Sequence, residues 1–94
     1  NVYPAQVEAA IYEHPAVAEC IVIGVPDPYR GQSAKAYVAL KPGADPFTLE
    51  DLRAFLVDRL GRHELPAALE IRDNLPRSAA GKLLASALKN EGGA

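Results

Sequence analysis

The spacing of hydrophobic residues near the start of the chain predicts a helix. A stripe recurs at intervals of three and four residues between two prolines, as on one face of a helix. The stripe consists of Val7, Ala10, Ile11 and His14. Pro4 fits the first helical turn and Pro15 ends the pattern, so we expect a helix of roughly ten residues.

The next two segments have the patterns of β-strands. Residues 20–25 are apolar at both alternating sets of positions, which predicts a central strand covered on each face. Residues 26–31 are rich in turn formers and end this strand. Residues 33–40 alternate, with a wetter face formed by Ser33, Lys35 and Tyr37 and an apolar face formed by Ala34, Ala36, Val38 and Leu40.

A second helix has explicit start and stop signals. Thr48 is placed to cap it with Asp51 at the third helical position, and Phe47 can contact Leu52 as a hydrophobic staple. Its buried stripe is Leu49, Leu52, Phe55, Leu56 and Leu60. Gly61 is the predicted stop after the last turn.

The remaining pattern completes a fold of the α+β class. Residues 69–72 alternate as a short third strand, and residues 82–89 form a closing helix with Leu84 and Leu88 on its inner face. The order is helix, strand, strand, helix, strand, helix. We therefore expect a small three-stranded sheet with flanking helices, in which the middle helix is a crossover between strands two and three.

Composition and charge restrict the class of protein. The chain has 94 residues, enough for one domain with a single modest core. Its net charge is −2 and its basic residues are scattered, so nothing indicates binding to nucleic acid or to an anionic membrane. No apolar stretch approaches the ~20 residues of a membrane span.

Two residue counts add to this picture. Cys20 is the one cysteine, so no internal disulfide can form, and a reducing compartment such as the cytoplasm is expected. Its apolar neighbours favour a buried thiol over a catalytic one. The chain has no Met, so we interpret it as a piece of a longer protein.

The stretch from Pro76 to Lys82 carries the clearest chemistry. It places a lysine behind Gly81, after a loop that begins with proline and at the start of an apolar helical run. A held lysine cation can receive phosphate or carboxylate oxygens. The stretch is not a Walker loop, because Pro76 replaces the first glycine and Leu83 replaces the hydroxyl residue. The alternative is that Lys82 is a solvated residue in the first turn of a helix.

Several segments together resemble a known family in order and spacing. They are Asn1-Val2-Tyr3-Pro4 with Val7-Glu8, His14-Pro15-Ala16-Val17 with Glu19, Gly24-Val25-Pro26-Asp27 with Gly31, Leu60, Pro66, Leu75-Pro76 and Gly81-Lys82. The chain thereby resembles the C-terminal subdomain of the adenylate-forming superfamily. That superfamily includes acyl-CoA synthetases, adenylation domains of peptide synthetases and firefly luciferase.

The resemblance implies a function for residues 1–94 as the mobile C-terminal subdomain of an AMP-forming acyl-CoA synthetase. Such ligases use ATP to activate a carboxylic acid, here a fatty or related acid, as an acyl-adenylate and pass the acyl group to CoA. The implied cofactors and substrates are ATP, Mg²⁺ and CoA, and the implied partner is the enzyme's own large N-terminal domain. That domain holds the acyl pocket and most adenine contacts, so we expect the isolated chain to be inactive.

The resemblance also implies that Lys82 is the lysine that this subdomain moves into the adenylation site. Gly81 and Lys82 would then contact ATP or the acyl-adenylate. A fixed cation between an attacking carboxylate and a phosphate favours the transition state, in which charge builds on the oxygens. The N-terminus of the expected last helix would add partial positive charge.

His14 has a structural and a metal-related interpretation. No second His, Cys or carboxylate stands at ligand spacing, because His63 is far away in the sequence. The structural interpretation is a helix-ending histidine that interacts with the last carbonyls. In the acetyl-CoA synthetase branch, main-chain oxygens around this turn are associated with Mg²⁺, which maps to Tyr12, His14 and Val17.

The chain departs from the family pattern at two places. His63-Glu64 stands where many members have Tyr-Lys, and Leu84-Ala85-Ser86 stands where many have a basic pair. Both differences remove positive charge near the expected path of a CoA phosphate. The spacing from Pro76 to Lys82 also resembles the site that protein lysine acetyltransferases modify in bacterial acyl-CoA synthetases, which implies such a partner.

Two other functions remain open at this point. Within the family, the chain is also compatible with a peptide-synthetase adenylation domain, whose acceptor is the thiol of a carrier-protein arm. The order of elements also suits a ferredoxin-like regulatory or ligand-binding module without chemistry. Such a module has no need of the Gly81-Lys82 loop, so loss of activity on changing Lys82 distinguishes the two classes.

Overall fold

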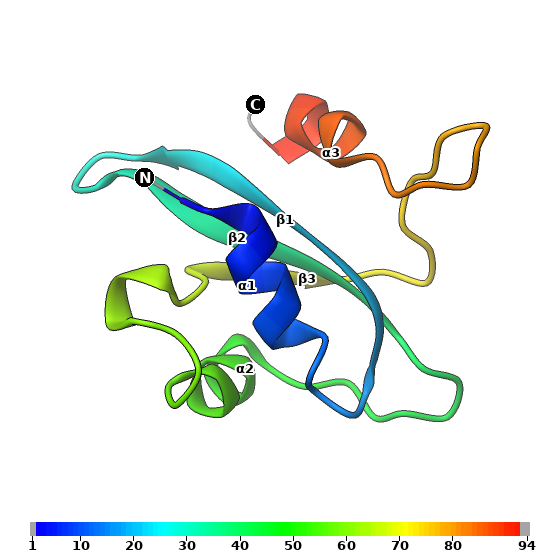
Figure 1. The fold of residues 1–94 in the computed structure, drawn as a ribbon, viewed down its shortest axis with the longest axis horizontal. Helices are drawn as coiled ribbons and strands as arrows, with labels where there is room; N and C mark the ends of the chain where they lie inside the picture. Colours follow the sequence, from blue (N-terminus) through cyan, green and yellow to red (C-terminus); the bar gives the residue numbers. More distant parts are fainter. Residues whose placement is uncertain (1, 93–94) are drawn as a thin grey trace.

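The elements occur in the predicted order. The computed structural model describes residues 2–92, so Asn1 of the first matching segment lies outside the described residues. The helices and strands are α1 (Pro4–Ile11), β1 (Val17–Asp27), β2 (Gly31–Leu40), α2 (Leu49–Leu56), the 3₁₀ turn η1 (Arg62–Glu64), β3 (Ala68–Ile71) and α3 (Ala85–Gly92). The three-stranded sheet and flanking helices confirm the predicted α+β class (Figure 1).

The sheet has the order β1-β2-β3, so the central strand is β2 and not the predicted segment in β1. β1 and β2 form an antiparallel hairpin, in which the carboxylate of Asp27 accepts hydrogen bonds from the N–H groups of Tyr29 (2.8 Å) and Arg30 (3.1 Å). β2 and β3 are parallel, and α2 lies in the connection between them, which confirms the predicted crossover.

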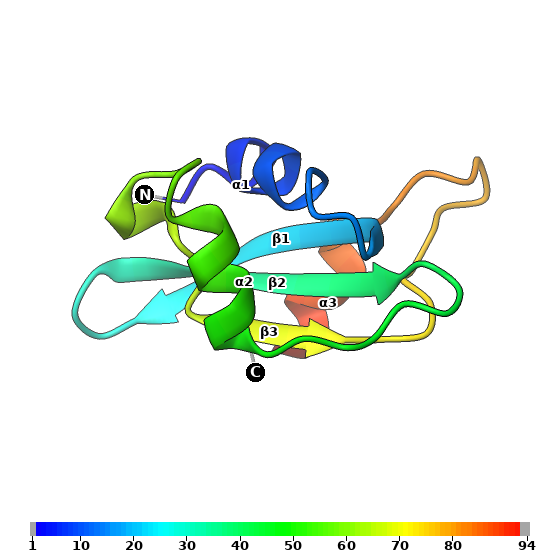
Figure 2. The same cartoon turned by 90° about the horizontal axis from the view of Figure 1, so that it is seen from below.

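β1 is nevertheless covered on both faces, which explains its continuous apolar run. Cys20 and Val22 pack with α1 and α2 in one cluster, while Ile21 and Ile23 pack with Leu88 of α3 in another. Figure 2 shows α2 in front of the strands and α3 behind them. Each fully buried Val, Leu or Ile contributes about 1.5–3 kcal/mol to folding.

α1 also protects the outer edge of β1. The hydroxyl of Tyr12 accepts a hydrogen bond from the N–H of Cys20 (3.2 Å), and the carboxylate of Glu8 accepts one from the N–H of Val22 (2.8 Å). These backbone groups point away from β2 and would otherwise offer a template for another strand. α1 therefore satisfies the sheet edge as well as covering the core.

The expected start of α2 is confirmed, but its expected stop is wrong. The hydroxyl of Thr48 accepts from the N–H of Asp51 (3.1 Å), and the Asp51 carboxylate accepts from the N–H of Thr48 (3.0 Å). The helix ends at Leu56 and is followed by a turn. Gly61 has an extended backbone, with φ −65° and ψ 152°, and it caps the start of η1 instead of the end of α2. Its N–H donates a hydrogen bond to the Glu64 carboxylate (2.8 Å).

The other two helices also differ from the prediction, since α1 is shorter and α3 is shifted towards the C-terminus. α1 ends at Ile11, so His14 lies in the turn that follows. α3 begins at Ala85 and not at Lys82, because Leu83 forms a β-bridge with Arg77 before the helix starts. Lys82 is therefore a loop residue, and the N-terminus of α3 does not lie at its backbone.

The face of β2 that was expected to be wetter is largely covered. Tyr37 is 0% exposed, although it alternates with Lys35. The ammonium of Lys35 lies 4.8 Å and the guanidinium of Arg72 lies 5.1 Å from the centre of its ring. The cationic ends of these two side chains thus cover the ring of Tyr37, and cation–π attraction favours this arrangement. The alternation of polar and apolar residues in the sequence does not reveal it.

No helix in the described part of the chain is long and apolar enough to cross a bilayer.

Candidate functional site

The lysine loop, defined here as residues 76–84, is a closed hairpin between β3 and α3. Leu83 pairs with Arg77 in a β-bridge, and the N–H of Leu84 donates to the carbonyl of Pro76 (2.9 Å). The N–H of Ser78 donates to the carbonyl of Lys82 (2.7 Å). The backbone around Lys82 is therefore held by hydrogen bonds on both sides of the loop.

Gly81 makes the turn of this hairpin possible. Its φ is +84°, a conformation that residues with a side chain rarely adopt. Its N–H donates to the carbonyl of Ser78 (2.9 Å), and the Ser78 hydroxyl accepts from the N–H of Lys82 (3.3 Å). An added Cβ at Gly81 would meet nothing within 4 Å, so the need for glycine is conformational and not steric.

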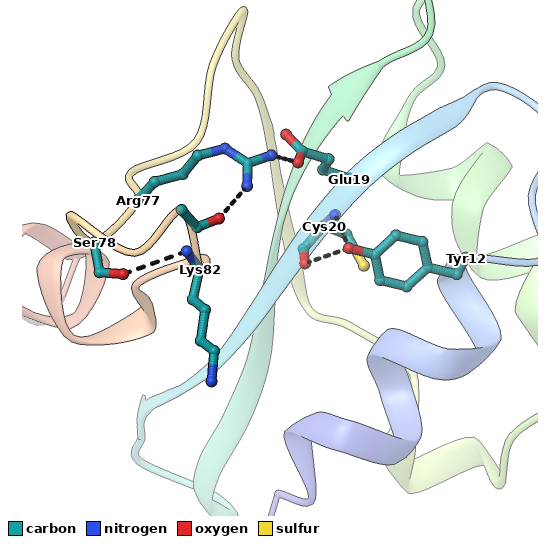
Figure 3. Close-up of polar contacts among 7 residues, drawn as sticks. Tyr12, Glu19, Cys20, Arg77, Ser78 and Lys82 are labelled. Atoms are coloured by element: carbon teal, nitrogen blue, oxygen red, sulfur yellow. Dashed lines mark hydrogen bonds and ion pairs between the residues drawn. The ribbon is translucent and has the colours of Figure 1, made fainter.

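The ammonium of Lys82 is free to act on another group. The residue is exposed, and its ammonium makes no hydrogen bond or ion pair within residues 2–92. Figure 3 shows the side chain extending from the loop with its nitrogen away from Ser78 and Arg77. A fixed backbone with a free cation can stabilise negative charge on a group that approaches the loop.

One arginine connects the lysine loop to the sheet. The guanidinium of Arg77 forms an ion pair with Glu19 of β1 and donates a hydrogen bond to the carbonyl of Gly81 (2.6 Å) (Figure 3). The sequence reasoning named Glu19 only as part of the family pattern and did not connect it with Arg77. Only the fold brings these two residues together.

The turn after α1 holds His14 in a structural role. Its ring centroid lies 4.6 Å from that of Phe47 and 4.8 Å from that of Phe55. Its Nδ1 accepts a hydrogen bond from the N–H of Ala16 (3.1 Å), so the expectation that the side chain binds the last helix carbonyls is wrong. Burial lowers the pKa of His14, which favours the neutral ring that accepts this hydrogen bond.

The main-chain oxygens named for Mg²⁺ belong to the same turn and the strand after it. The carbonyl of His14 already accepts from the N–H of Val17 (3.1 Å), which leaves one lone pair for a cation. Among the described residues no group of three His, Cys, Asp or Glu side chains could hold a metal. Carbonyl oxygens suit a hard cation, so Mg²⁺ at Tyr12, His14 and Val17 stays a prediction.

A second feature lies beside the β1–β2 hairpin, and Figure 1 shows the turn of this hairpin at the opposite end of the sheet from the lysine loop. The feature is an open hollow of about 410 Å³, and its lining residues are Val2, Arg30, Gln32, Arg62 and His63. Sequence reasoning treated His63 as isolated and did not find this group. The basic residues come from the hairpin and from η1, so no local spacing could have shown it.

Cys20 is a structural cysteine, as predicted. Its side chain is 1% exposed, and its Sγ donates to the carbonyl of Glu8 (3.7 Å). Burial, with a smaller effect from the Glu8 carboxylate, raises the pKa of the thiol to about 12.

We therefore expect Cys20 to resist thiol reagents while the protein is folded. At pH 7.5 a thiol with this pKa is thiolate roughly 10³-fold less often than a free one of pKa ~8.5. Titration with a chromogenic thiol reagent should find almost no reaction in buffer and one thiol per chain in denaturant. Rapid labelling of the folded protein would contradict the buried position.

Comparison with known proteins identifies the family. Residues 6–82 match the model of the AMP-binding enzyme C-terminal domain. The chain belongs to this family. The match ends at Lys82, the residue that the lysine loop presents. The resemblance found in the sequence is thereby confirmed.

Relatives of this chain are ligases that are much longer than it. It is 50% identical over 91 residues to the long-chain-fatty-acid–CoA ligase of Bacillus subtilis, covering 97% of this chain and 16% of the relative. It is 42% identical over 90 residues to the fatty acid–[acyl-carrier-protein] ligase ScoC of Streptomyces coeruleorubidus, covering 96% of this chain and 17% of the relative.

A solved structure has the same fold and a shared sequence pattern. The ATP-bound crystal structure of MatB from Rhodopseudomonas palustris superimposes with a TM-score of 0.86 at 32% identity. The superposition covers 97% of this chain and 18% of that one. This chain therefore corresponds to a small part of each of these larger proteins.

Proposed function

We propose that this chain is the mobile C-terminal subdomain of an ATP-dependent acyl-CoA ligase that activates a fatty or related carboxylic acid. Family membership and ligase relatives support this proposal, and two of the relatives are named for fatty acids. The observation that carries it is Lys82, an exposed cation on a loop whose backbone is held by hydrogen bonds. The acyl pocket and the adenine site are assigned to the enzyme's N-terminal domain.

In the proposed adenylation step, the acid's carboxylate oxygen bonds to the α-phosphorus of ATP while the bond to pyrophosphate breaks. Two anions approach each other, and negative charge then concentrates on the oxygens around the α-phosphorus. The Lys82 ammonium is placed by the loop to lie between them, with Gly81 letting the backbone turn at this point. The lysine acts as a fixed charge and does not transfer a proton.

In the second step, a thiol loses its proton to solvent, its sulfur bonds to the acyl carbon, and the bond from that carbon to AMP breaks. We expect the subdomain to rotate between the two steps and to withdraw Lys82, which the second step does not need. Mg²⁺ would neutralise phosphate charge when bound, and the main-chain oxygens of Tyr12, His14 and Val17 are its proposed donors on this chain. The free, buried Cys20 supports a cytoplasmic location for the protein.

A carrier-protein thiol is a second candidate for the acceptor. The observation that favours it is the 42% identity to ScoC, which is named for an acyl-carrier-protein acceptor. Both candidates share the adenylation step, so the role of Lys82 is the same in each.

An ATP–pyrophosphate exchange screen on the full-length protein tests this proposal. Acids of different length and polarity are compared, and each activated acid is then offered CoA or a phosphopantetheinylated carrier protein. We expect exchange with at least one fatty or related acid and transfer to CoA. The absence of exchange with every acid would contradict the ligase function and favour a regulatory module without chemistry.

We expect the isolated 94-residue chain to fold but to have no adenylation activity. One lysine on a small sheet cannot position both ATP and an acid, and positioning supplies much of the rate. Circular dichroism and the same exchange assay measure the two properties on one sample. Pyrophosphate release by the isolated chain with any carboxylate would contradict this prediction.

A further inference from the structure

The lysine loop lies outside the folded core except at its two ends. Leu75 before it is 5% exposed and Leu83 packs against the same cluster as Leu88. Between these anchors the tip is open, since Ala79, Ala80, Gly81 and Lys82 are all exposed. Hydrogen bonds inside the hairpin keep its shape, but they do not hold it against the sheet.

Arg77 supplies the polar connection from this hairpin to the sheet. One terminal nitrogen of its guanidinium pairs with the Glu19 carboxylate, and the other donates to the carbonyl of Gly81 (2.6 Å). Glu19 lies in β1 opposite Ala39 of β2, so its backbone is fixed by the β-ladder. A planar, forked cation is well suited to hold two acceptors in this way, because its two terminal nitrogens donate in fixed directions.

The second acceptor is adjacent to the lysine. The carbonyl of Gly81 belongs to the peptide group whose nitrogen is that of Lys82, so Arg77 holds the plane of that peptide. Ser78 holds the same peptide from inside the hairpin, through its hydroxyl and the N–H of Lys82 (3.3 Å). Rotation of this peptide would redirect the lysine side chain.

We propose that Arg77 and Glu19 are positioning residues that fix the direction in which Lys82 enters the adenylation site. This inference rests on the proposed role of Lys82. Neither side chain needs to touch the substrates, because the effect passes through the Gly81–Lys82 peptide. A displacement of a reacting group by 1 Å can lower a rate by about 10²-fold, so a loosened hairpin has a measurable cost.

The chain offers a matched control for this pair. Arg59 pairs with Glu13 (3.1 Å) and donates to the carbonyl of Phe55 (2.7 Å), so it also joins a carboxylate to a backbone carbonyl. It lies just after α2, and neither of its partners belongs to the lysine loop. Replacing Arg59 therefore measures how much activity is lost when the same kind of contacts is removed far from Lys82.

The experiment measures both half-reactions of the full-length enzyme for Arg77→Gln, Glu19→Gln and the control Arg59→Gln. We expect the first two to lower kcat for pyrophosphate exchange by roughly 10-fold with little change in the KM for ATP, since a positioning loss acts in the transition state. Transfer from a supplied acyl-adenylate should stay within about twofold of the parent rate, as should both half-reactions of the control.

The deciding measurement repeats Arg77→Gln and Glu19→Gln in a Lys82→Ala background. If these residues act through the lysine, they cause no further loss there, because interacting residues are non-additive. The same factor of loss in both backgrounds, or parent exchange rates for both single variants, would overturn the inference. Full exchange by Lys82→Ala itself would instead overturn the proposed role of Lys82, and with it this dependent inference.

Discussion

Replacing Lys82 by alanine in the full-length ligase lowers the adenylation rate by at least about 10²–10³-fold, the usual cost of removing one group that stabilises an oxyanion. Its ammonium makes no hydrogen bond or ion pair with the described side chains, so we expect the fold not to depend on it. The lost group acts only where charge builds up in the transition state. The expected signature is therefore a fall in kcat without a change in the unfolding temperature.

Separate half-reactions show whether Lys82 acts in the first step alone. Pyrophosphate exchange reports adenylation, and thioester formation from a supplied acyl-adenylate reports transfer. We expect Lys82→Ala to reduce exchange severely and transfer far less. Lys89→Ala is the matched control, because Lys89 is also exposed and lies on α3. Equal loss in both half-reactions would contradict the assignment of Lys82 to adenylation.

Local sequence signals predicted those parts of the fold that neighbouring residues determine. The Thr48–Asp51 capping box needs only the residues between them, and both of its hydrogen bonds form as expected. The continuous apolar run of residues 20–25 correctly indicated a strand covered on both faces. The run could not show that the strand lies at the sheet edge, because α1 rather than a neighbouring strand completes its hydrogen bonds.

The errors occur where a contact with a nearby residue overrides the preference that the sequence pattern indicates. Glycine is a typical residue at the end of a helix, yet Gly61 caps the start of η1, because its N–H donates to the Glu64 carboxylate. Lys82 precedes an apolar run that favours a helix, yet the β-bridge between Arg77 and Leu83 delays α3 until Ala85. In both cases the competing partner is itself only a few residues away, but in a conformation that composition does not predict.

The candidate site shows the same division. Gly81 and Lys82 could be found from the sequence because their spacing from Pro76 follows a family pattern. Glu19 lies far from Arg77 in the sequence, and only the packing of the loop against β1 brings them together. The residue proposed to carry the charge could thus be found from the sequence, whereas the residues proposed to direct it require the fold.

Acetylation of Lys82 should stop adenylation and deacetylation should restore it. Presentation to another domain requires that this lysine be exposed, and the same exposure makes it accessible to a protein acetyltransferase. The acetyl group removes the positive charge and leaves an amide, so the phosphate oxygens lose their partner. We expect a loss of exchange close to that of Lys82→Ala, about 10²-fold or more, with transfer from a supplied acyl-adenylate largely kept.

Mass spectrometry of the full-length protein after incubation with acetyl-CoA and a candidate acetyltransferase measures this modification beside the exchange rate. Lys41 and Lys89 are exposed lysines on the same chain, so their modification levels show whether Lys82 is selected or only accessible. A Lys82→Arg variant keeps a positive charge but cannot be acetylated there, and its residual activity should not respond to the acetyltransferase. Acetylation of Lys41 or Lys89 with Lys82 untouched, or full exchange by protein acetylated at Lys82, would show that the loop is not a control point.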